Sequence, residues 1–263
     1  MEIREEGGLK YLHRIESILL ADDSRLITLD DVRQLDGQVA ALLLELPQRE
    51  MGGLLPDFET LEGISAWCSD HDIRLHLDGA RLYECLPHYH KTASEIADLF
   101  DSVYISFYKG IGGVAGAILA GPADFVHEAK VWKRRQGGDL ISLYPYIVAA
   151  DYYFERRIRK MAQYAGWARE LASYFNQLPH IHTRPGVPVT NMFHVHVDRP
   201  PAIVAPFFQA VTEETGIGFA ASLMPAASGS YFEVSLGDAF ERVPQDRLEK
   251  AFGYLGEMLQ TLN

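Results

Sequence analysis

The chain has 263 residues, of which 48% are hydrophobic and 11% aromatic, enough to bury a sizeable core in one large domain or in a large and a small one. A formal net charge of −12 argues against nucleic acid or an anionic membrane surface as a partner. The charged start MEIREEGG resembles no signal peptide, and no apolar run approaches the length of a membrane span, so we expect a soluble, cytoplasmic protein.

Short apolar runs alternate with helix-like segments between Ala40 and Leu119. This alternation is typical of α/β units arranged around a parallel sheet, with helices on both faces. We therefore predict an α/β fold with a mainly parallel sheet. Strands are expected at 41–46, 73–78, 103–107 and 115–121, and an amphipathic helix at 57–71.

The second half of the chain changes character. A helical stretch follows Pro145 and runs to about Leu178, and a loop with three prolines then marks a boundary at 178–188. Beyond the loop, two apolar strands alternate with two helices, a pattern typical of a small α+β unit. We predict a large α/β domain at 1–180 and a small C-terminal α+β domain at 181–263. The second-half strands are expected at 191–197 and 230–236, with helices ending near Thr215 and beginning near Gln245.

One lysine lies where the expected strand 103–107 runs into a patch of glycines. In SFYKGIGGVAG, Lys109 is followed at once by Gly110, and the glycines permit tight turns and the close approach of another group. A lysine in this position is either a solvated loop charge or a nucleophile directed at a ligand.

A second polar cluster follows the strand before it. In LHLDGARL, Asp78 ends the expected strand and Arg81 begins a helix. Ligands of open α/β sheets bind at the carboxyl ends of the strands, and an arginine fork suits a carboxylate or a phosphate. The structural alternative is that Asp78 caps the helix and Arg81 makes an ion pair.

Asp78 and Lys109 follow successive strands, so both side chains can reach one crevice at the edge of the sheet. A carboxylate and a lysine that face one ligand suit pyridoxal 5′-phosphate: the lysine forms the Schiff base, and the aspartate keeps the pyridine nitrogen protonated. Arg81 would then bind the carboxylate of an amino-acid substrate. The spacing suggests this arrangement without excluding others.

Two other patterns suggest different kinds of site. Gly110, Gly112 and Ala115 match the dinucleotide fingerprint G-x-G-x-x-A, but that motif needs a helix next, and AGAILAG indicates a strand. The alternating His194 and His196 in FHVHV lie on one strand face, where two metal ligands could sit; we favour a structural role because no third ligand stands at a useful spacing.

The motifs together resemble the β-eliminating lyase and threonine aldolase family, which are fold-type I pyridoxal-phosphate enzymes. The resemblance extends from near residue 2 to the C-terminus. It implies the fold of the PLP-dependent transferases, pyridoxal 5′-phosphate as cofactor, a small amino acid as substrate, and a homodimer or homotetramer. The matching segments, in the expected order, are ELPQREMGG (45–53), HLDGAR (76–81), FYKGIGG (107–113), WKRRQGG (132–138) and LYPY (143–146).

The resemblance also implies roles for individual residues. Lys109 is expected to be the Schiff-base lysine, Asp78 the partner of the pyridinium nitrogen, and Arg81 the ligand of the substrate carboxylate. Ser106 and His76 are expected near the cofactor. The implied reaction is retro-aldol cleavage of a β-hydroxy amino acid to glycine and an aldehyde; the alternative is β-elimination.

Three positions depart from the family pattern. Gln48 stands where threonine aldolases commonly carry a histidine, and a glutamine cannot act as a base near neutral pH. Ile141 and Glu233 stand where arginines are common. These departures argue against cleavage of threonine itself.

Family members also have roughly a further quarter of chain before the point that matches residue 1. That segment carries the loop that holds the cofactor phosphate, so we expect this chain alone to bind the cofactor weakly. The alternative interpretation is a truncated, non-catalytic family member that serves as an interaction subunit.

Overall fold

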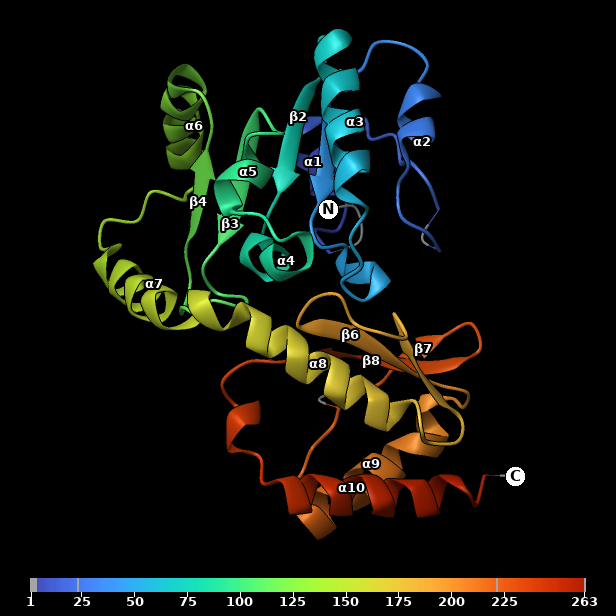
Figure 1. Cartoon of the computed structure of the whole chain (residues 1–263). Helices are drawn as coiled ribbons and strands as arrows, with labels where there is room; N and C mark the ends of the chain where they lie inside the picture. The colour runs from blue at the N-terminus through green and yellow to red at the C-terminus, as the bar shows by residue number, and fades with distance from the viewer. Residues whose placement is uncertain (1–3, 23, 221, 263) are drawn as a thin grey trace.

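The computed structural model describes residues 4–22, 24–220 and 222–262, and it contains two β-sheets, one in each half of the chain. Figure 1 shows the first sheet in the upper half of the molecule and the second sheet in the lower half. Helix α8 (Met161–Phe175) runs from the first half into the second.

The first sheet contains the strands that were predicted to carry the site. Its order is β1-β2-β3-β4; the first three strands are parallel, and β4 runs antiparallel to β3. Helices connect the parallel strands, because parallel neighbours need a crossover. The mainly parallel α/β sheet is therefore confirmed. The strands are β1 (Ala41–Glu45), β2 (Arg74–Asp78), β3 (Ser102–Ser106) and β4 (Ala117–Ala120).

Side chains on β1 alternate between a buried and an exposed face. Leu42 and Leu44 are buried, whereas Leu43 between them is 40% exposed. The buried face packs against helix α3 (Phe58–Asp70), whose Leu61 and Ile64 lie on one helical stripe. The helices of this half are α1 (Gly8–His13), α2 (Leu29–Arg33), the 3-10 turn η1 (Arg49–Met51), α3 (Phe58–Asp70), α4 (Leu82–Tyr89), α5 (Ala93–Ala97) and α6 (Ala123–Arg135).

The helical stretch predicted from Pro145 to about Leu178 is divided in two. Helix α7 (Tyr144–Arg157) ends in the 3-10 turn η2 (Ile158–Lys160), and α8 follows it directly. Arg157 lies at this junction, where its Nη1 donates a hydrogen bond to the carbonyl of Ile111 at 3.0 Å. The junction thus connects the helical stretch to the loop that follows Lys109.

The second sheet is antiparallel throughout, with the order β5-β6-β8-β7. Strand β5 lies inside the segment predicted to be a loop, so that part of the prediction is wrong: the short run IHTR pairs along the edge of β6. The elements are β5 (Ile181–Arg184), β6 (Met192–Val197), α9 (Pro201–Thr215), β7 (Met224–Ala226), β8 (Gly229–Ser235), η3 (Phe240–Arg242) and α10 (Gln245–Leu259).

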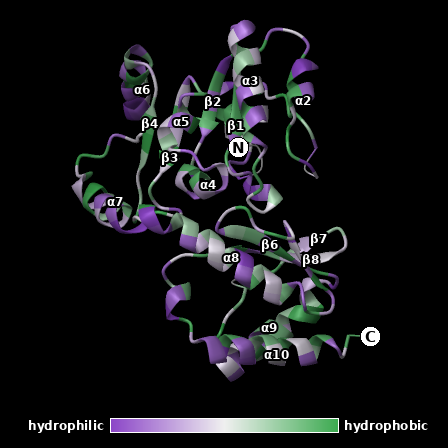
Figure 2. Cartoon of the chain, viewed as in Figure 1, coloured by the Kyte–Doolittle hydropathy of each residue, from purple (hydrophilic) through white to green (hydrophobic). Residues whose placement is uncertain are grey.

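Each sheet has its own hydrophobic cluster. The second cluster joins α8, α9 and α10 to one face of β6 and β8, with Phe175 packed edge-on against Phe193 and Phe232. Figure 2 shows hydrophobic residues along the strands of both sheets. The opposite face of β6 and β8 carries His194 and Glu233, which pair across the strands. That polar face is turned toward the first half of the molecule, because Glu233 contacts Arg49 there.

No helix among the described residues is long and apolar enough to cross a membrane. The domain boundary proposed near residue 180 falls between α8 and β5. The N-terminal part of α8 packs against Tyr83 of helix α4, and its C-terminal part belongs to the second hydrophobic cluster.

Candidate active site

Asp78 and Lys109 lie after neighbouring parallel strands, as their order in the sequence predicts. Asp78 is the last residue of β2 and pairs in register with Tyr104 on β3. Lys109 follows the end of β3 by three residues. Because β2 and β3 are parallel, both residues belong to the carboxyl edge of the sheet, where ligands of open α/β sheets bind.

The two side chains differ in how they are engaged. The Asp78 Oδ1 accepts a hydrogen bond from the backbone N–H of Ala80 at 3.2 Å, which shapes the turn into helix α4. Within the described part of the chain, the Lys109 ammonium makes no hydrogen bond or ion pair; its nearest aromatic contact is the ring of Tyr108, at 5.8 Å. The lysine amine is therefore available to a ligand.

The glycines after Lys109 are required by what packs against them. A Cβ at Gly110 would overlap the carboxylate of Glu84, and one at Gly112 would overlap the guanidinium of Arg157. Gly112 also has a φ of +77°, a conformation that side-chain-bearing residues rarely adopt. The turn that carries Lys109 is thus held between α4 and the α7–η2 junction.

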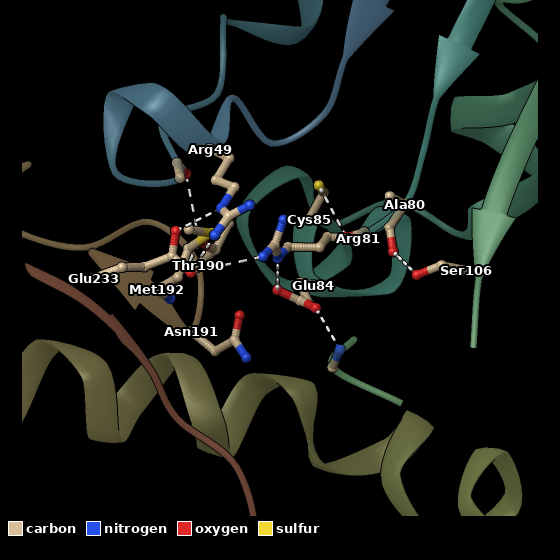
Figure 3. A network of polar contacts seen from close by, with 12 residues as sticks. Arg49, Ala80, Arg81, Glu84, Cys85, Ser106, Thr190, Asn191, Met192 and Glu233 are labelled. Carbon is tan, nitrogen blue, oxygen red and sulfur yellow. Dashed lines mark hydrogen bonds and ion pairs between the residues drawn. The ribbon is translucent and has the colours of Figure 1, made fainter. Parts of the chain in front are cut away.

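Arg81 lies between two carboxylates in the centre of Figure 3. Its side chain is only 9% exposed; the Nε is 3.8 Å from Glu84 Oε2, and the Nη2 is 3.9 Å from Glu233 Oε1. Both separations exceed a hydrogen-bond length. Arg81 is therefore held by charge in a partly polar interior, with its donors not saturated by these two partners.

Glu233 reaches this cluster from the second sheet. Its carboxylate binds Arg49, with an Nε–Oε2 distance of 2.6 Å, and the imidazole Nε2 of His194 lies 3.9 Å away. Burial lowers the pKa of His194, while Glu233 opposes that change. Arg49, Glu233 and Arg81 thus form a chain of alternating charges between the two halves of the molecule (Figure 3).

Glu84 is the most deeply buried ionisable group of the cluster. Its side chain lies one turn after Arg81 on α4, and its Oε1 accepts a hydrogen bond from the Gly110 N–H at 3.0 Å. Among the described residues its Oε2 has no hydrogen-bond partner. Burial raises the pKa of Glu84 to about 7, although the nearby Arg81 lowers it.

Ser106 lies at the end of β3 and His76 lies within β2, and both side chains are hydrogen bonded to other groups of the protein. The buried Ser106 hydroxyl donates to the carbonyl of Ala80 at 2.8 Å, joining the end of β3 to the turn after Asp78. The His76 Nδ1 lies 2.8 Å from the hydroxyl of Ser102, and burial lowers the pKa of His76. Both contacts link β2, or the turn that follows it, to β3.

A cavity of about 220 Å³ opens beside the carboxyl ends of β1 and β2. It contains Asp78 together with Gln48, the position that the family resemblance singled out. Burial and the neighbouring Asp78 raise the pKa of Glu45, so this carboxyl ionises less readily than usual. The lining residues are Asp22, Arg25, Leu43, Glu45, Gln48, Glu50, Met51 and Asp78.

The paired histidines of β6 form part of a stack of rings. His196 lies against His182 and Tyr231, with ring centroids 5.1 Å and 5.5 Å apart. Over residues 4–22, 24–220 and 222–262, no group of three or more histidine, cysteine or acidic side chains is placed to hold a metal ion.

Comparison with known families identifies the fold. Residues 1–199 match the family model described as β-eliminating lyase. The chain belongs to this family. The likeness is strong in structure too: a protein of Exiguobacterium sp. 255-15, provisionally named an aromatic amino acid β-eliminating lyase/threonine aldolase, is 56% identical with a TM-score of 0.94. The match covers 97% of this chain and 72% of that one.

The chain is also similar to other proteins that are named as aldolases. A Listeria monocytogenes EGD-E structure, provisionally named an L-allo-threonine aldolase, is 53% identical over 97% of this chain and 72% of its own, with a TM-score of 0.94. The low-specificity L-threonine aldolase of Eremothecium gossypii is 29% identical over 51% of this chain. The matched part spans only 37% of that curated relative's length. These matches confirm the family and the fold predicted from the sequence.

Glu84 and Arg49 of the charged cluster were not singled out in the sequence analysis. Glu84 could have been noticed as an acid one helical turn after Arg81, on a face that also carries apolar residues. Arg49 gives no such signal, because its partner Glu233 is 184 residues away in the sequence. Only the docking of the two sheets brings these two together.

Proposed function

We propose that the chain is the catalytic part of a pyridoxal 5′-phosphate-dependent lyase that acts on a small amino acid, threonine aldolase-like in its reaction. The observation that carries the proposal is the placement of an unengaged lysine, Lys109, and a carboxylate, Asp78, at the carboxyl ends of adjacent parallel strands. The names of the relatives support it: several are low-specificity L-threonine aldolases.

The side chains present fit the chemistry of this cofactor. Lys109 offers a primary amine without a competing partner among the described residues, which suits covalent attachment to an aldehyde. Asp78 offers a carboxylate that suits a protonated pyridine nitrogen. When bound, the cofactor supplies an electron sink for the charge that develops at the substrate Cα.

The chain's own residues provide the rest of the mechanism. Arg81 binds the substrate carboxylate, and its two loose ion pairs leave donors for that purpose. Glu233 then shifts its contact fully to Arg49, to which it is already hydrogen bonded. Holding the substrate carboxylate fixes which bond at Cα is aligned for cleavage.

β-Elimination is the second candidate, and a specific residue favours it. Gln48 lines the cavity beside Asp78, and a glutamine does not accept a proton from a substrate hydroxyl near neutral pH. Cleavage between Cα and Cβ of a β-hydroxy amino acid needs such an acceptor, whereas loss of a good β-leaving group does not.

The proposal includes a homodimer or homotetramer in the cytoplasm. Large apolar side chains are exposed along α6, α7 and the segment between them, where a second copy would remove them from water. A hollow of about 520 Å³ on α6 lies within this surface. The exposed residues are Phe125, Val131, Trp132, Leu140, Ile141, Leu143, Tyr144, Ile147, Val148 and Tyr152. Sedimentation velocity over a range of concentrations measures the oligomeric state.

The first test of the function is covalent trapping. Pyridoxal phosphate is added to the purified chain, borohydride is used to fix any bound cofactor, and peptide mapping locates the modified lysine. We expect modification at Lys109 that is abolished in Lys109→Ala and unchanged in Lys130→Ala, which removes an exposed lysine on α6. Modification spread over surface lysines in a folded chain would contradict the proposal. Glycine and aldehyde release, compared with ammonia release, then separates the two reactions.

A further inference from the structure

The same carboxyl group contacts both functional segments of the site. Glu84 Oε1 accepts the N–H of Gly110, the residue that follows Lys109, and Glu84 Oε2 lies 3.8 Å from the guanidinium of Arg81. Figure 3 shows the Glu84 carboxylate next to the Arg81 guanidinium. An acid in the first turn of a helix commonly points to solvent and favours the helix dipole; Glu84 is instead 3% exposed and bonds outside its helix.

We propose that Glu84 is a positioning residue: one carboxyl oxygen fixes the turn that carries Lys109, and the other orients Arg81 toward Glu233. The roles of Lys109 and Arg81 rest on the proposed function. The contacts of Glu84 are independent of it.

The close fit at Gly110 supports this assignment. A Cβ on Gly110 would overlap the Glu84 carboxylate, so the turn is built in direct contact with that group. A residue that merely filled space could be replaced by an apolar side chain, but the Gly110 N–H would then lose its acceptor. The contact therefore determines where the turn lies relative to α4.

The charged surroundings of Glu84 couple it to the ligand. Burial is the largest influence on its pKa and raises it to about 7; Arg81, the Gly110 N–H and Lys109 lower the pKa, and Glu233 on β8 raises it. When an anion binds Arg81, Glu84 loses part of its strongest counter-charge and takes up a proton near neutral pH. Occupation of Arg81 thus changes the charge beside Lys109.

The test is a titration of the full chain that needs no cofactor. Glutamate carboxyl carbons are labelled with ¹³C, and the Glu84 signal is assigned by its loss in Glu84→Gln. We expect a midpoint near 7 in the wild type, as burial predicts. Arg81→Gln should raise the midpoint by about one pH unit, because the main opposing cation is removed. Glu62→Gln, which removes an exposed acid on α3, should leave the midpoint unchanged.

Hydrogen exchange at the Gly110 amide tests the second contact. Glutamine keeps an oxygen for this N–H, so Glu84→Gln should preserve the protection, whereas Glu84→Ala should accelerate exchange about tenfold or more. The assignment would be overturned if the Gly110 amide exchanged at equal rates in the wild type and in Glu84→Ala. It would also be overturned if the Glu84 midpoint were near 4.5 and did not change in Arg81→Gln. If Glu84→Ala does not fold, the wild-type and Arg81→Gln titrations still decide.

A third readout separates this inference from the proposed function. Glu84→Gln should keep the wild-type rate of cofactor fixation at Lys109. In Glu84→Ala this rate should fall about tenfold. If the wild type shows no fixation but the titration and exchange results hold, the proposed function fails and the positioning role stands. If fixation occurs in the wild type and in Glu84→Ala at equal rates, the positioning role fails alone.

Discussion

Arg49 and Glu233 join the two halves of the molecule through a hydrogen-bonded ion pair, with Nε 2.6 Å from Oε2 and Nη2 3.4 Å from Oε1. The two side chains are 30% and 25% exposed, so water screens the pair only partly. Arg49 belongs to the turn after β1, and Glu233 belongs to β8. This pair lies at the contact between the first half of the chain and the polar face of the second sheet.

Breaking this pair should lower the stability of the whole chain. We expect Arg49→Ala and Glu233→Gln each to reduce the free energy of unfolding by about 1–2 kcal/mol, because each leaves a partly buried charge without its partner. The double variant should cost less than the sum, with a coupling of about 1 kcal/mol. Urea denaturation measures these changes. Glu241→Gln, at an exposed ion pair with Lys160, is the control and should cost at most about 0.5 kcal/mol.

The turn after Lys109 should not tolerate a side chain at Gly112. Gly112→Ala places a Cβ where the Arg157 guanidinium lies and forces a φ of +77° on an alanine. We expect a loss of at least about 1–2 kcal/mol, measured by thermal or urea unfolding. Gly166→Ala is the matched control in helix α8, where nothing lies within 4 Å of the new Cβ; it should stabilise the chain by about 0.5–1 kcal/mol. Equal effects at both positions would show that the Lys109 turn is not tightly packed.

Tyr164 belongs to a second polar cluster, which Arg157 links to the turn that follows Lys109. Its buried hydroxyl donates a hydrogen bond to Asp238 Oδ1 at 2.5 Å. The Asp238 carboxylate also accepts hydrogen bonds from Arg157 and Lys160. Burial alone would raise the pKa of Asp238, but these hydrogen bonds hold it well below its usual range. Tyr164→Phe should cost about 1–2 kcal/mol at neutral pH.

The pH dependence of that cost follows from the lowered pKa of Asp238. Its stabilising contribution is present above the unfolded pKa, 3.8, and is lost as the pH falls below it. The Tyr164→Phe deficit should therefore shrink in acid. Tyr174→Phe on the same helix, whose exposed hydroxyl accepts from Gln245, should cost at most about 0.5 kcal/mol at any pH.

His196 should make the second sheet sensitive to acid. Burial, followed by His182, His194 and Arg184, lowers its pKa from 6.5 to about 4, and its Nε2 is buried without a hydrogen-bond partner among the described residues. The folded state thus favours the neutral ring. Its contribution is complete above pH 6.5 and is lost as the pH falls toward 4, by at most about 2 kcal/mol after allowance for solvent screening.

The corresponding experiment compares unfolding free energies between pH 7 and pH 4. His196→Gln, which cannot titrate, should flatten the dependence relative to the wild type. His127→Gln, at an exposed position on α6, should leave the slope unchanged. A wild-type slope retained in His196→Gln would assign the acid sensitivity to other groups.

The sequence was sufficient for the elements whose signal is local. Strands β1, β2 and β3 were predicted because their apolar runs are bounded by turn residues, and the position of Asp78 and Lys109 at one sheet edge followed from parallel order. Strand β5 was missed because IHTR is short, half polar and flanked by prolines. Its pairing depends on the edge offered by β6, which no local pattern records.

The charged cluster depends on tertiary contacts, so the sequence revealed only part of it. Arg81 was identified by its place after a strand. Glu233 was noticed only as a departure from a family arginine, and its contact with Arg49 requires the two sheets to meet. The burial of Glu84, which governs its charge, follows from the packing of α4 against the Lys109 turn.

Strand β4 and helix α6 follow one another along the chain, and neither contains a buried residue. Opening this segment exposes little buried apolar surface to water. Its separation from β3 therefore costs far less free energy than unfolding either hydrophobic core. Its amides should exchange with solvent ahead of those of β1, β2 and β6. A partner surface that covers this segment would therefore slow amide exchange within the segment before it changed the free energy of unfolding of the whole molecule.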